Sequence, residues 1–254
     1  QEQNSFPGIT TRKLAPHATH VFLGFGGAGS LISTKGQVTV SGNPVRQSLL
    51  GGDRNEAMRH FGLDPSKRTI LIIGGSQGSR PINRAITRGL LDESLPESCQ
   101  LLWQTGRLDH DQIVSELGDR AKGHTLFAFS NEMRLVYAAA DIAIARAGAL
   151  TIAELEACGV PAILVPYPFA AGDHQRKNAD EYAGRGVAVV VDQKELDRED
   201  VLRRAADALQ DGTADRMRAA LTQQQRSEPA VDVIANGIID LIQREHSAGG
   251  IGDN

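Results

Sequence analysis

Short apolar runs alternate with longer amphipathic stretches between residues 69 and 191. Runs such as Thr69-Ile-Leu-Ile-Ile73 and Asp141-Ile-Ala-Ile-Ala145 are typical of buried strands, whereas the stretches between them repeat with the period of a helix. Parallel neighbouring strands need a crossover, which a helix supplies. The pattern predicts an α/β fold with a Rossmann-like, doubly wound parallel sheet. The predicted strands are 69–73, 100–104, 124–127, 141–145, 162–165 and 187–191, and the predicted helices are 79–91, 109–117, 131–140, 149–158 and 174–185.

The two ends of the chain follow different patterns. After Asp192 the sequence is helical, with candidate helices at 197–209, 214–225 and 229–245. Residues 1–40 offer only a helix at 7–16, a strand at 19–23 and a Gly-rich loop, and a second short strand follows at 37–41 before a helix at 53–61. These elements cannot close a sheet alone. We therefore expect four parts: the end of an N-terminal domain with a linker (1–40), a complete ligand-binding domain (41–228), a C-terminal helix (229–246) and a disordered tail (247–254).

Composition excludes several classes of protein. The chain has 27 Lys plus Arg against 31 Asp plus Glu, a formal net charge of −4. This balance argues against electrostatic binding of nucleic acid over the whole protein surface. Cys99 and Cys158 are the only cysteines, so the sequence signals neither a disulfide framework nor a Cys-rich zinc site. No apolar run approaches the ~18 to 20 residues that span a bilayer. We expect no nucleic-acid partner and a protein that is soluble or peripheral to a membrane.

The segment Gly74-Gly-Ser-Gln-Gly78 follows a predicted strand and opens a predicted helix. In open α/β sheets the ligand crevice lies at this position. Glycines let the backbone approach a ligand, and the N–H groups at the helix N-terminus favour an anion such as a diphosphate. No Gly-Lys-Ser/Thr follows, so the segment is not a Walker A loop. A tight turn without a ligand is the other interpretation.

A second strand-to-helix junction, at residues 146–151, has two interpretations. Thr151 and Glu154 have the spacing of a capping box, in which each side chain accepts a hydrogen bond from the other residue's backbone N–H. Alternatively, the N–H groups of residues 149–151 bind a phosphate and the Glu154 carboxylate binds ribose hydroxyls. The spacing alone leaves both open.

A third junction carries polar side chains. His174, Gln175 and Asn178 stand at i, i+1 and i+4, so they can share one side of a helix near its N-terminus. Their donors and acceptors suit a hydroxyl-rich ligand, although a solvated first turn has the same composition.

Two further motifs imitate known sites. Gly24-Phe-Gly-Gly-Ala-Gly29 has the spacing of a dinucleotide-binding loop, but the next strand begins too soon for a crossover helix, so we expect a mobile loop and no nicotinamide cofactor. Asp109-His-Asp111 imitates a metal-binding Asp-x-Asp motif, but it begins an amphipathic helix, where acidic residues complement the helix dipole. We predict no metal site and no cofactor.

Taken together, these segments resemble the MurG family of peptidoglycan N-acetylglucosaminyltransferases, part of glycosyltransferase family 28. The matching motifs occur in the family's order over nearly the whole chain: Glu2-Gln-Asn4 with Pro7-Gly8, Gly42-Asn-Pro-Val-Arg46, Gly74-Gly-Ser-Gln-Gly78, Arg146-x-Gly148-Ala-Leu-Thr151 with Glu154, and Gln175-x-x-Asn178-Ala179. The resemblance implies a GT-B fold. It also implies inverting transfer of N-acetylglucosamine from UDP-GlcNAc to undecaprenyl-diphosphate-linked muramoyl pentapeptide (lipid I to lipid II), a step of cell-wall synthesis that supports cell shape and division. The implied location is cytoplasmic, peripheral on the inner face of the bacterial cell membrane.

The resemblance also implies a set of substrate-binding residues, and it assigns no catalytic base. Asn4 and Arg46 would face the cleft, Ser76 and Gln77 would touch the diphosphate and sugar, and Ser130 belongs to a stretch whose backbone would read uracil. By the same resemblance, Ala149, Leu150 and Thr151 would meet the phosphates, Glu154 would bind the ribose, and Gln175 with its neighbours His174 and Asn178 would hold the sugar hydroxyls.

The sequence departs from the family pattern at its start. Residue 1 is Gln where the family motif usually has His, and residues 24–36 are unusually Gly-rich. The family's N-terminal Gly-rich loop with its His is absent, as is the apolar patch that docks the N-terminal domain on the membrane. We therefore expect this chain to be the donor-binding half, inactive alone. Two alternatives stay open: a UDP-GlcNAc 2-epimerase-like enzyme, and a donor-binding subunit that works with a separate acceptor subunit.

Overall fold

The computed structural model describes residues 1–249, and it divides the chain into two compact units. The larger unit is Arg46–Gln225, and the smaller unit combines Gln1–Val45 with the chain from Arg226 onward. The predicted domain boundaries after residues 40 and 228 stay predictions, and the divisions between the units fall close to them. Each unit is described by itself.

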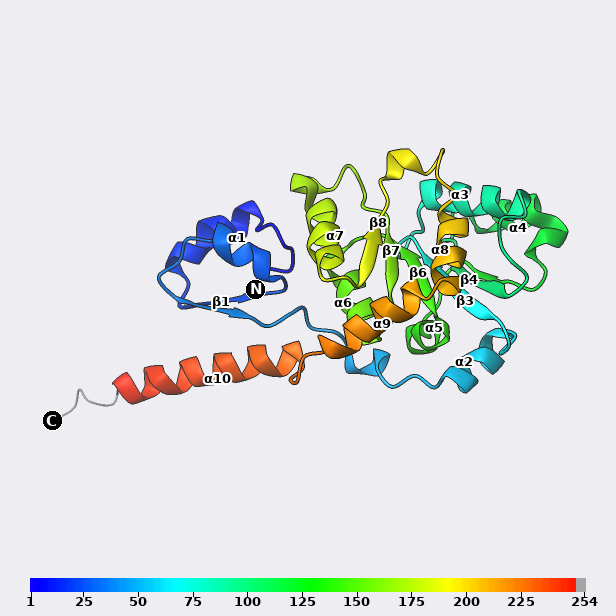
Figure 1. Ribbon diagram of the computed structural model, residues 1–254. Helices are drawn as coiled ribbons and strands as arrows, with labels where there is room; N and C mark the ends of the chain where they lie inside the picture. The colour runs from blue at the N-terminus through cyan, green and yellow to red at the C-terminus, as the bar shows by residue number, and fades with distance from the viewer. Residues whose placement is uncertain (250–254) are drawn as a thin grey trace. The chain divides into compact units, whose positions relative to one another are not determined.

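The larger unit is built on a six-stranded parallel sheet with the strand order β5-β4-β3-β6-β7-β8 (Figure 1). This is the order of a classical doubly wound sheet, in which the direction of winding reverses between the first and fourth strands. The predicted fold class is confirmed, and all six predicted strands exist, with ends that shift by at most one residue. Their bounds are β3 (Arg68–Ile73), β4 (Cys99–Gln104), β5 (Thr125–Phe127), β6 (Ile142–Ala145), β7 (Ala162–Leu164) and β8 (Ala188–Val190).

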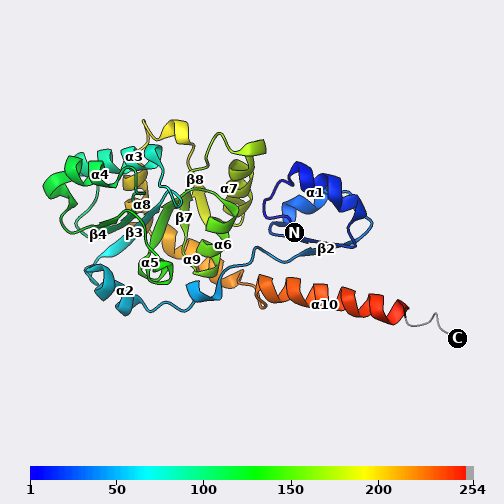
Figure 2. The same ribbon diagram turned by 180° about the vertical axis from the view of Figure 1, so that it is seen from behind.

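Helices cover the sheet, as the crossovers require (Figures 1 and 2). The main apolar core joins alternate strand residues, including Ile70, Ile72 and the fully buried Trp103, to helices α3 (Arg80–Leu91), α4 (His110–Leu117) and α8 (Val201–Gln210). Residues between them, such as Leu71, point to the opposite face, where α5 (Met133–Ala139) contacts β3. The helices of this unit are α2 (Arg54–Phe61), α3 (Arg80–Leu91), α4 (His110–Leu117), α5 (Met133–Ala139), α6 (Ala149–Ala157), α7 (His174–Gly184), α8 (Val201–Gln210) and α9 (Thr213–Gln223).

Local capping explains why one predicted boundary was wrong. The helix expected at 197–209 begins only at Val201, because the Asp200 carboxylate accepts a hydrogen bond from the Arg203 N–H and so fixes the helix start. Before it, residues Gln193–Glu195 form a separate 3-10 turn. That turn brings Gln193 to the carboxyl edge of the sheet, where it takes part in the candidate site described below.

The smaller unit has two parallel strands, β1 (His20–Leu23) and β2 (Gln37–Val40). The Gly-rich segment expected to be a mobile loop instead contains a 3-10 helix, Gly26–Leu31, whose buried Ala28 packs with Val21 and Leu23. The predicted helix 7–16 is shorter, with α1 (Ile9–Leu14) followed by a 3-10 turn at Ala15–His17.

The last helix of the chain, α10 (Ala230–Gly249), belongs to the smaller unit and runs past the predicted end at 246. It packs closely on β1, since a Cβ atom at Gly237 would lie 2.6 Å from the Phe22 ring. The remainder of the predicted disordered tail, residues 250–254, lies outside the described residues. No helix of the described chain is long and apolar enough to cross a membrane.

Candidate functional site

A cavity of about 470 Å³ lies where the sheet reverses its winding, at the carboxyl ends of β3, β6 and β7. Open α/β sheets bind their ligands in this crevice. Its wall combines the Gly74–Pro81 segment, the Arg146–Thr151 junction, the Tyr167–Gln175 loop and Gln193. Among the described residues that line it there is no Asp, Glu or His side chain. The cavity therefore suits an anionic or hydroxyl-rich ligand better than a cation.

In the Gly-rich loop after β3, two glycines lie where the backbone packs too closely for a side chain. A Cβ atom at Gly74 would lie 2.4 Å from the Ser79 nitrogen, and Gly78 has φ = 79° and would place a Cβ atom 2.1 Å from the Thr105 oxygen. The loop thus folds tightly and presses against the loop after β4. Ser76 and Gln77 lie exposed at its tip and do not line the cavity. The tight turn is established, and ligand contact by Ser76 and Gln77 stays a prediction.

Arg146 is a buried cation at the cavity wall, and the sequence analysis did not single it out as a site residue. Its Nη2 donates to Ser79 Oγ at 2.7 Å and to Gln193 Oε1 at 2.6 Å, and its Nη1 donates to the carbonyl oxygens of Val165 and Pro166. It therefore joins the loops that follow β3, β7 and β8. The sequence signals for this role were its position directly after a buried strand and its place at the start of a matching family motif.

The charge of Arg146 has no internal counterion in the described part of the chain, where its hydrogen-bond acceptors are all neutral. Burial lowers its pKa to about 10, so the guanidinium stays protonated at neutral pH. A buried charge without an opposite charge is costly, and a bound anion would offset that cost. This arrangement favours an anionic ligand in the cavity.

The junction after β6 corrects the capping-box interpretation. Helix α6 begins with Gly148 as its N-cap, without a side-chain cap, so Thr151 lies inside the first turn. Glu154 instead accepts a hydrogen bond of 2.7 Å from the hydroxyl of the buried Tyr137. Burial and the Glu154 charge raise the pKa of Tyr137 above its ordinary value, which keeps that hydroxyl a donor. Ribose binding by Glu154 stays a prediction.

The first turn of α6 lies against the cavity through Gly148 and Thr151. The N–H groups of Ala149, Leu150 and Thr151 have no partner within the helix, because the first turn of any α-helix lacks acceptors for them. These N–H groups and the helix dipole favour an anion, and phosphate binding there, which the family resemblance implies, stays a prediction.

The loop before α7 positions Gln175 at the cavity. The Tyr167 backbone N–H donates to Gln175 Oε1 at 3.0 Å, which leaves the amide nitrogen of Gln175 to donate to a ligand. His174 is half-buried at the start of α7. Asn178 is fully buried, and its side chain donates to the Ala147 oxygen at 3.4 Å. Asn178 therefore supports the neighbouring loop in this structure, and its direct contact with a ligand stays a prediction.

Gln104, a buried residue that the sequence analysis missed, connects the Gly-rich loop to the segment around Ser130. Its Nε2 donates to the Gly75 oxygen at 3.1 Å, and its Oε1 accepts from the Ser130 N–H at 3.3 Å. The Ser130 hydroxyl in turn accepts from the Glu132 N–H. The stretch predicted to read uracil is thus fastened to the loop predicted to meet the diphosphate.

Two predicted site residues lie elsewhere. Arg46 is exposed at the start of the larger unit and does not line the cavity. Asn4 belongs to the smaller unit, where its backbone N–H and its side-chain amide both donate to Glu2 Oε1. Cleft-facing roles for these residues stay predictions.

In the Asp-x-Asp motif, the carboxylate of the first residue already accepts hydrogen bonds from other side chains of the protein. Asp109 pairs with Arg80 at 3.0 Å through one carboxylate oxygen and accepts from Asn83 Nδ2 at 3.1 Å through the other. Among the described residues, no group of three or more His, Cys, Asp or Glu side chains is placed to hold a metal ion.

The strand order and the cavity at the reversal point define a doubly wound domain of the kind that binds nucleotides and nucleotide-linked substrates. Residues 69–234 match the family model described as the glycosyltransferase family 28 C-terminal domain. The chain belongs to that family.

Two relatives and one solved structure support this family assignment. A transferase of Chlorobium limicola is 40% identical over 83% of this chain and 57% of its own length, and one of Chlorobium luteolum is 39% identical over 97% of this chain and 66% of its own length. Both are named UDP-N-acetylglucosamine--N-acetylmuramyl-(pentapeptide) pyrophosphoryl-undecaprenol N-acetylglucosamine transferase. The crystal structure of Acinetobacter baumannii MurG superposes with a TM-score of 0.72 and 26% identity, over 96% of this chain and 65% of that one. The chain thus spans somewhat more than half the length of these relatives.

Proposed function

We propose that this chain supplies the donor-binding half of an inverting glycosyltransferase that moves N-acetylglucosamine from UDP-GlcNAc to undecaprenyl-diphosphate-linked muramoyl pentapeptide. The names of the two Chlorobium relatives support this substrate pair. The observation that carries the proposal is the convergence of the buried Arg146 cation, the Gly74–Gly78 loop and the N-terminus of α6 on one cavity without acidic lining.

These parts suit the chemistry of a diphosphate leaving group. When a sugar hydroxyl displaces UDP at the anomeric carbon, a base takes the hydroxyl proton and negative charge develops on the departing diphosphate. The unpaired N–H groups of residues 149–151 and the cation of Arg146 are fixed in place before the reaction, so they stabilise that charge without reorganising. The described cavity lining offers no side chain for the base, which we assign to a part of the enzyme outside this cavity.

Donor recognition would then extend from one end of the site to the other. The Ser130 segment lies at the proposed uracil end, Glu154 takes the ribose, and Gln175 with His174 holds sugar hydroxyls. The direct bond of Gln104 to both Gly75 and Ser130 supports this order, because it keeps the proposed base-reading and phosphate-binding segments in register.

An epimerase is the weaker interpretation. Epimerisation of UDP-GlcNAc needs both an acid and a base side chain beside the sugar, whereas the described cavity lining has no carboxylate or imidazole and our proposal places only one such side chain, His174, at the sugar. A donor-binding subunit that works with a separate acceptor-binding partner has the same site as our proposal, so the two share every prediction about UDP.

We further propose that the enzyme lies in the cytoplasm. It would contact the acceptor and the inner face of the bacterial cell membrane through a domain other than the larger unit.

Calorimetric titration tests the proposal directly. The whole chain should bind UDP and UDP-GlcNAc, should bind uridine much more weakly, and should not transfer sugar to the lipid acceptor by itself. Absence of UDP binding at millimolar protein would refute the donor site. Efficient transfer by the chain alone would refute the claim that it is a half.

A further inference from the structure

Exposed aromatic side chains gather at the carboxyl edge of the sheet. Only three aromatic residues of the described chain are strongly exposed: Phe129 at 41%, Tyr167 at 42% and Phe169 at 79%. Phe129 follows β5, and Tyr167 and Phe169 follow β7, so all three lie on loops at the edge that holds the cavity. A single exposed apolar residue needs no explanation, but this shared placement does.

Phe169 is the most exposed of them, and it lines the cavity together with the Gly74–Gly78 loop, Thr151 and Gln175. It also lines a second, adjacent cavity of about 510 Å³ with Asp173, so its ring forms part of the wall that the two cavities share. The ring is thus placed beside the side chain predicted to hold sugar hydroxyls.

The loop that carries Phe169 is held in place by contacts of the neighbouring Tyr167. Tyr167 donates its backbone N–H to Gln175 Oε1, and its ring lies 5.5 Å from the Arg146 guanidinium carbon. Phe169 meets Tyr167 edge to face, with ring centroids 5.7 Å apart at 71°. Tyr167 is therefore occupied by Arg146 and Phe169, whereas most of the Phe169 surface faces open space.

We propose that Phe169 binds the sugar of the donor by stacking on the pyranose ring, an inference that rests on the proposed nucleotide-sugar site. A hexose presents hydroxyls around its rim and C–H groups on its faces. Gln175 can donate to the rim, while the electron-rich face of Phe169 attracts the C–H groups. Binding the sugar would cover an aromatic ring that the free protein leaves exposed, and it would make Phe169 a determinant of donor specificity.

The test compares the affinities of UDP and UDP-GlcNAc in the whole chain by calorimetry. In Phe169→Ala, UDP affinity should stay within about twofold of the parent, whereas UDP-GlcNAc affinity should fall roughly threefold to tenfold. Phe169→Tyr should keep the parent's ratio of the two affinities, because it keeps the ring. Phe169→Leu should behave like the alanine variant, because it keeps an apolar side chain without the ring.

Leu108→Ala is the matched control, since Leu108 is 77% exposed and lines no cavity described here. It should leave both affinities unchanged. Equal weakening of UDP and UDP-GlcNAc by Phe169→Ala, or no change in either, would overturn the stacking role while leaving the donor site intact. If the parent chain bound no UDP, the proposed function would fall and this inference with it.

Discussion

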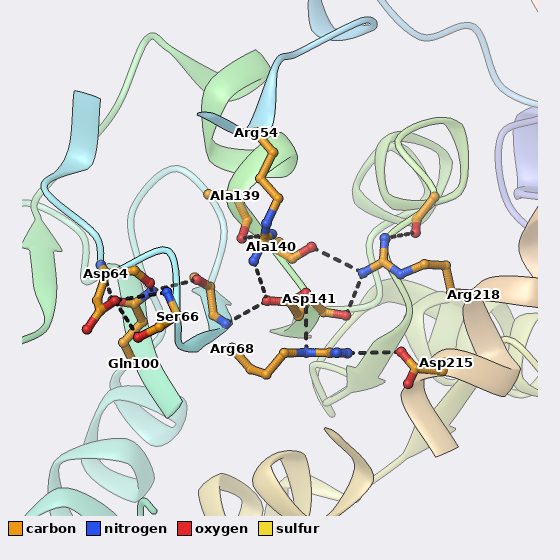
Figure 3. A network of polar contacts seen from close by, with 12 residues as sticks. Arg54, Asp64, Ser66, Arg68, Gln100, Ala139, Ala140, Asp141, Asp215 and Arg218 are labelled. Carbon is orange, nitrogen blue, oxygen red and sulfur yellow. Dashed lines mark hydrogen bonds and ion pairs between the residues drawn. The ribbon is translucent and has the colours of Figure 1, made fainter. Parts of the chain in front are cut away.

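The two ends of strand β6 carry opposite charges that are treated in opposite ways. Asp141 stands immediately before the strand and Arg146 immediately after it, and both are buried. Asp141 lies at the amino edge of the sheet inside a network of arginines (Figure 3). Arg146 lies at the carboxyl edge, where its described acceptors are neutral.

Groups of the protein itself neutralise the Asp141 carboxylate. It accepts from the Thr69 N–H at 2.7 Å and pairs with Arg54 at 2.9 Å and with Arg68 at 3.4 Å. Arg68 also pairs with Asp215, and the Arg218 guanidinium donates to the Asp141 backbone oxygen (Figure 3). This network ties α2, β3 and α9 to the start of β6.

The difference is that charges at the amino edge are neutralised within the protein, whereas the charge at the carboxyl edge is available to a ligand under our proposal. At the amino edge, opposite charges neutralise each other and connect elements that are distant in sequence. At the carboxyl edge, a cation stays uncompensated beside the unpaired N–H groups of a helix N-terminus. Under the proposed function, the same strand has one end that stabilises the fold and one end that contributes to ligand binding, and substitutions at the two ends should separate these effects.

The largest effect is expected on stability, from Asp141→Asn. The change removes the counterion of Arg54 and one of the two counterions of Arg68, and breaking such a network costs about 3 kcal/mol of unfolding free energy. Trp103 is the only tryptophan and is fully buried in the larger unit, so its fluorescence during denaturation reports the unfolding of that unit. In the absence of denaturant, the affinity for UDP should be unchanged. Unchanged stability, or a specific loss of UDP binding, would contradict the division between the two edges.

The next effect is on ligand affinity, from Arg146→Met. Hydrogen bonds and charge contacts to ionised groups are worth about 1.5 to 3 kcal/mol, so UDP affinity should fall roughly tenfold to a hundredfold. Calorimetry with uridine, UMP and UDP separates the charge from the shape of the site. The loss should grow with the number of phosphates.

Arg146→Lys sharpens that measurement, because lysine keeps the charge but cannot bridge Ser79, Gln193 and the carbonyl oxygens together. We expect it to recover part of the UDP affinity. If Arg146→Met weakened uridine, UMP and UDP equally, Arg146 would only hold the loops in place, and its charge would have no role toward the ligand.

Most of the larger unit could be predicted from the sequence, because its strands are continuous apolar runs and its helices repeat cleanly between them. Errors arose where a side chain or a close contact decided the local structure. Asp200 delayed the start of α8, and the packing of Ala28 turned the predicted Gly-rich loop into a 3-10 helix. Such contacts join particular atoms, so hydrophobic periodicity cannot reveal them.

The site was predicted less completely than the fold. The strand-to-helix junctions were found, because glycines and polar residues directly after buried strands are visible in the sequence. Gln104, Arg146 and Gln193 were missed as members of the site, since each contributes through contacts with loops that are distant in the chain. The spacing of Thr151 and Glu154 left a capping box and a ligand-binding role open, and the capping box is excluded only by the structure, in which Gly148 is the N-cap.

Glu154→Gln asks whether a carboxylate near the carboxyl edge serves the protein, as Asp141 does, or the ligand. The glutamine oxygen can still accept from Tyr137, so unfolding monitored by Trp103 should be nearly unchanged. If Glu154 binds the ribose, losing the charge should weaken UDP about tenfold. Lowered stability with unaltered UDP affinity would assign Glu154 to the protein's own structure.

The smallest effect is expected from removing divalent cations or the Asp109 charge. Asp109 is an acid at the carboxyl edge that is neutralised internally, as Asp141 is at the other edge, because Arg80 and Asn83 occupy both of its oxygens. We expect EDTA to leave UDP affinity unchanged, and Asp109→Asn to change it by less than about twofold, since only a partly exposed ion pair is lost. Calorimetry with EDTA, and then with added Mg²⁺ or Mn²⁺, checks both. Loss of UDP binding in EDTA that Mg²⁺ or Mn²⁺ restores would mean that an acidic side chain at this edge holds a metal for the diphosphate. The contrast between the two ends of β6 would then rest on that metal as well as on Arg146.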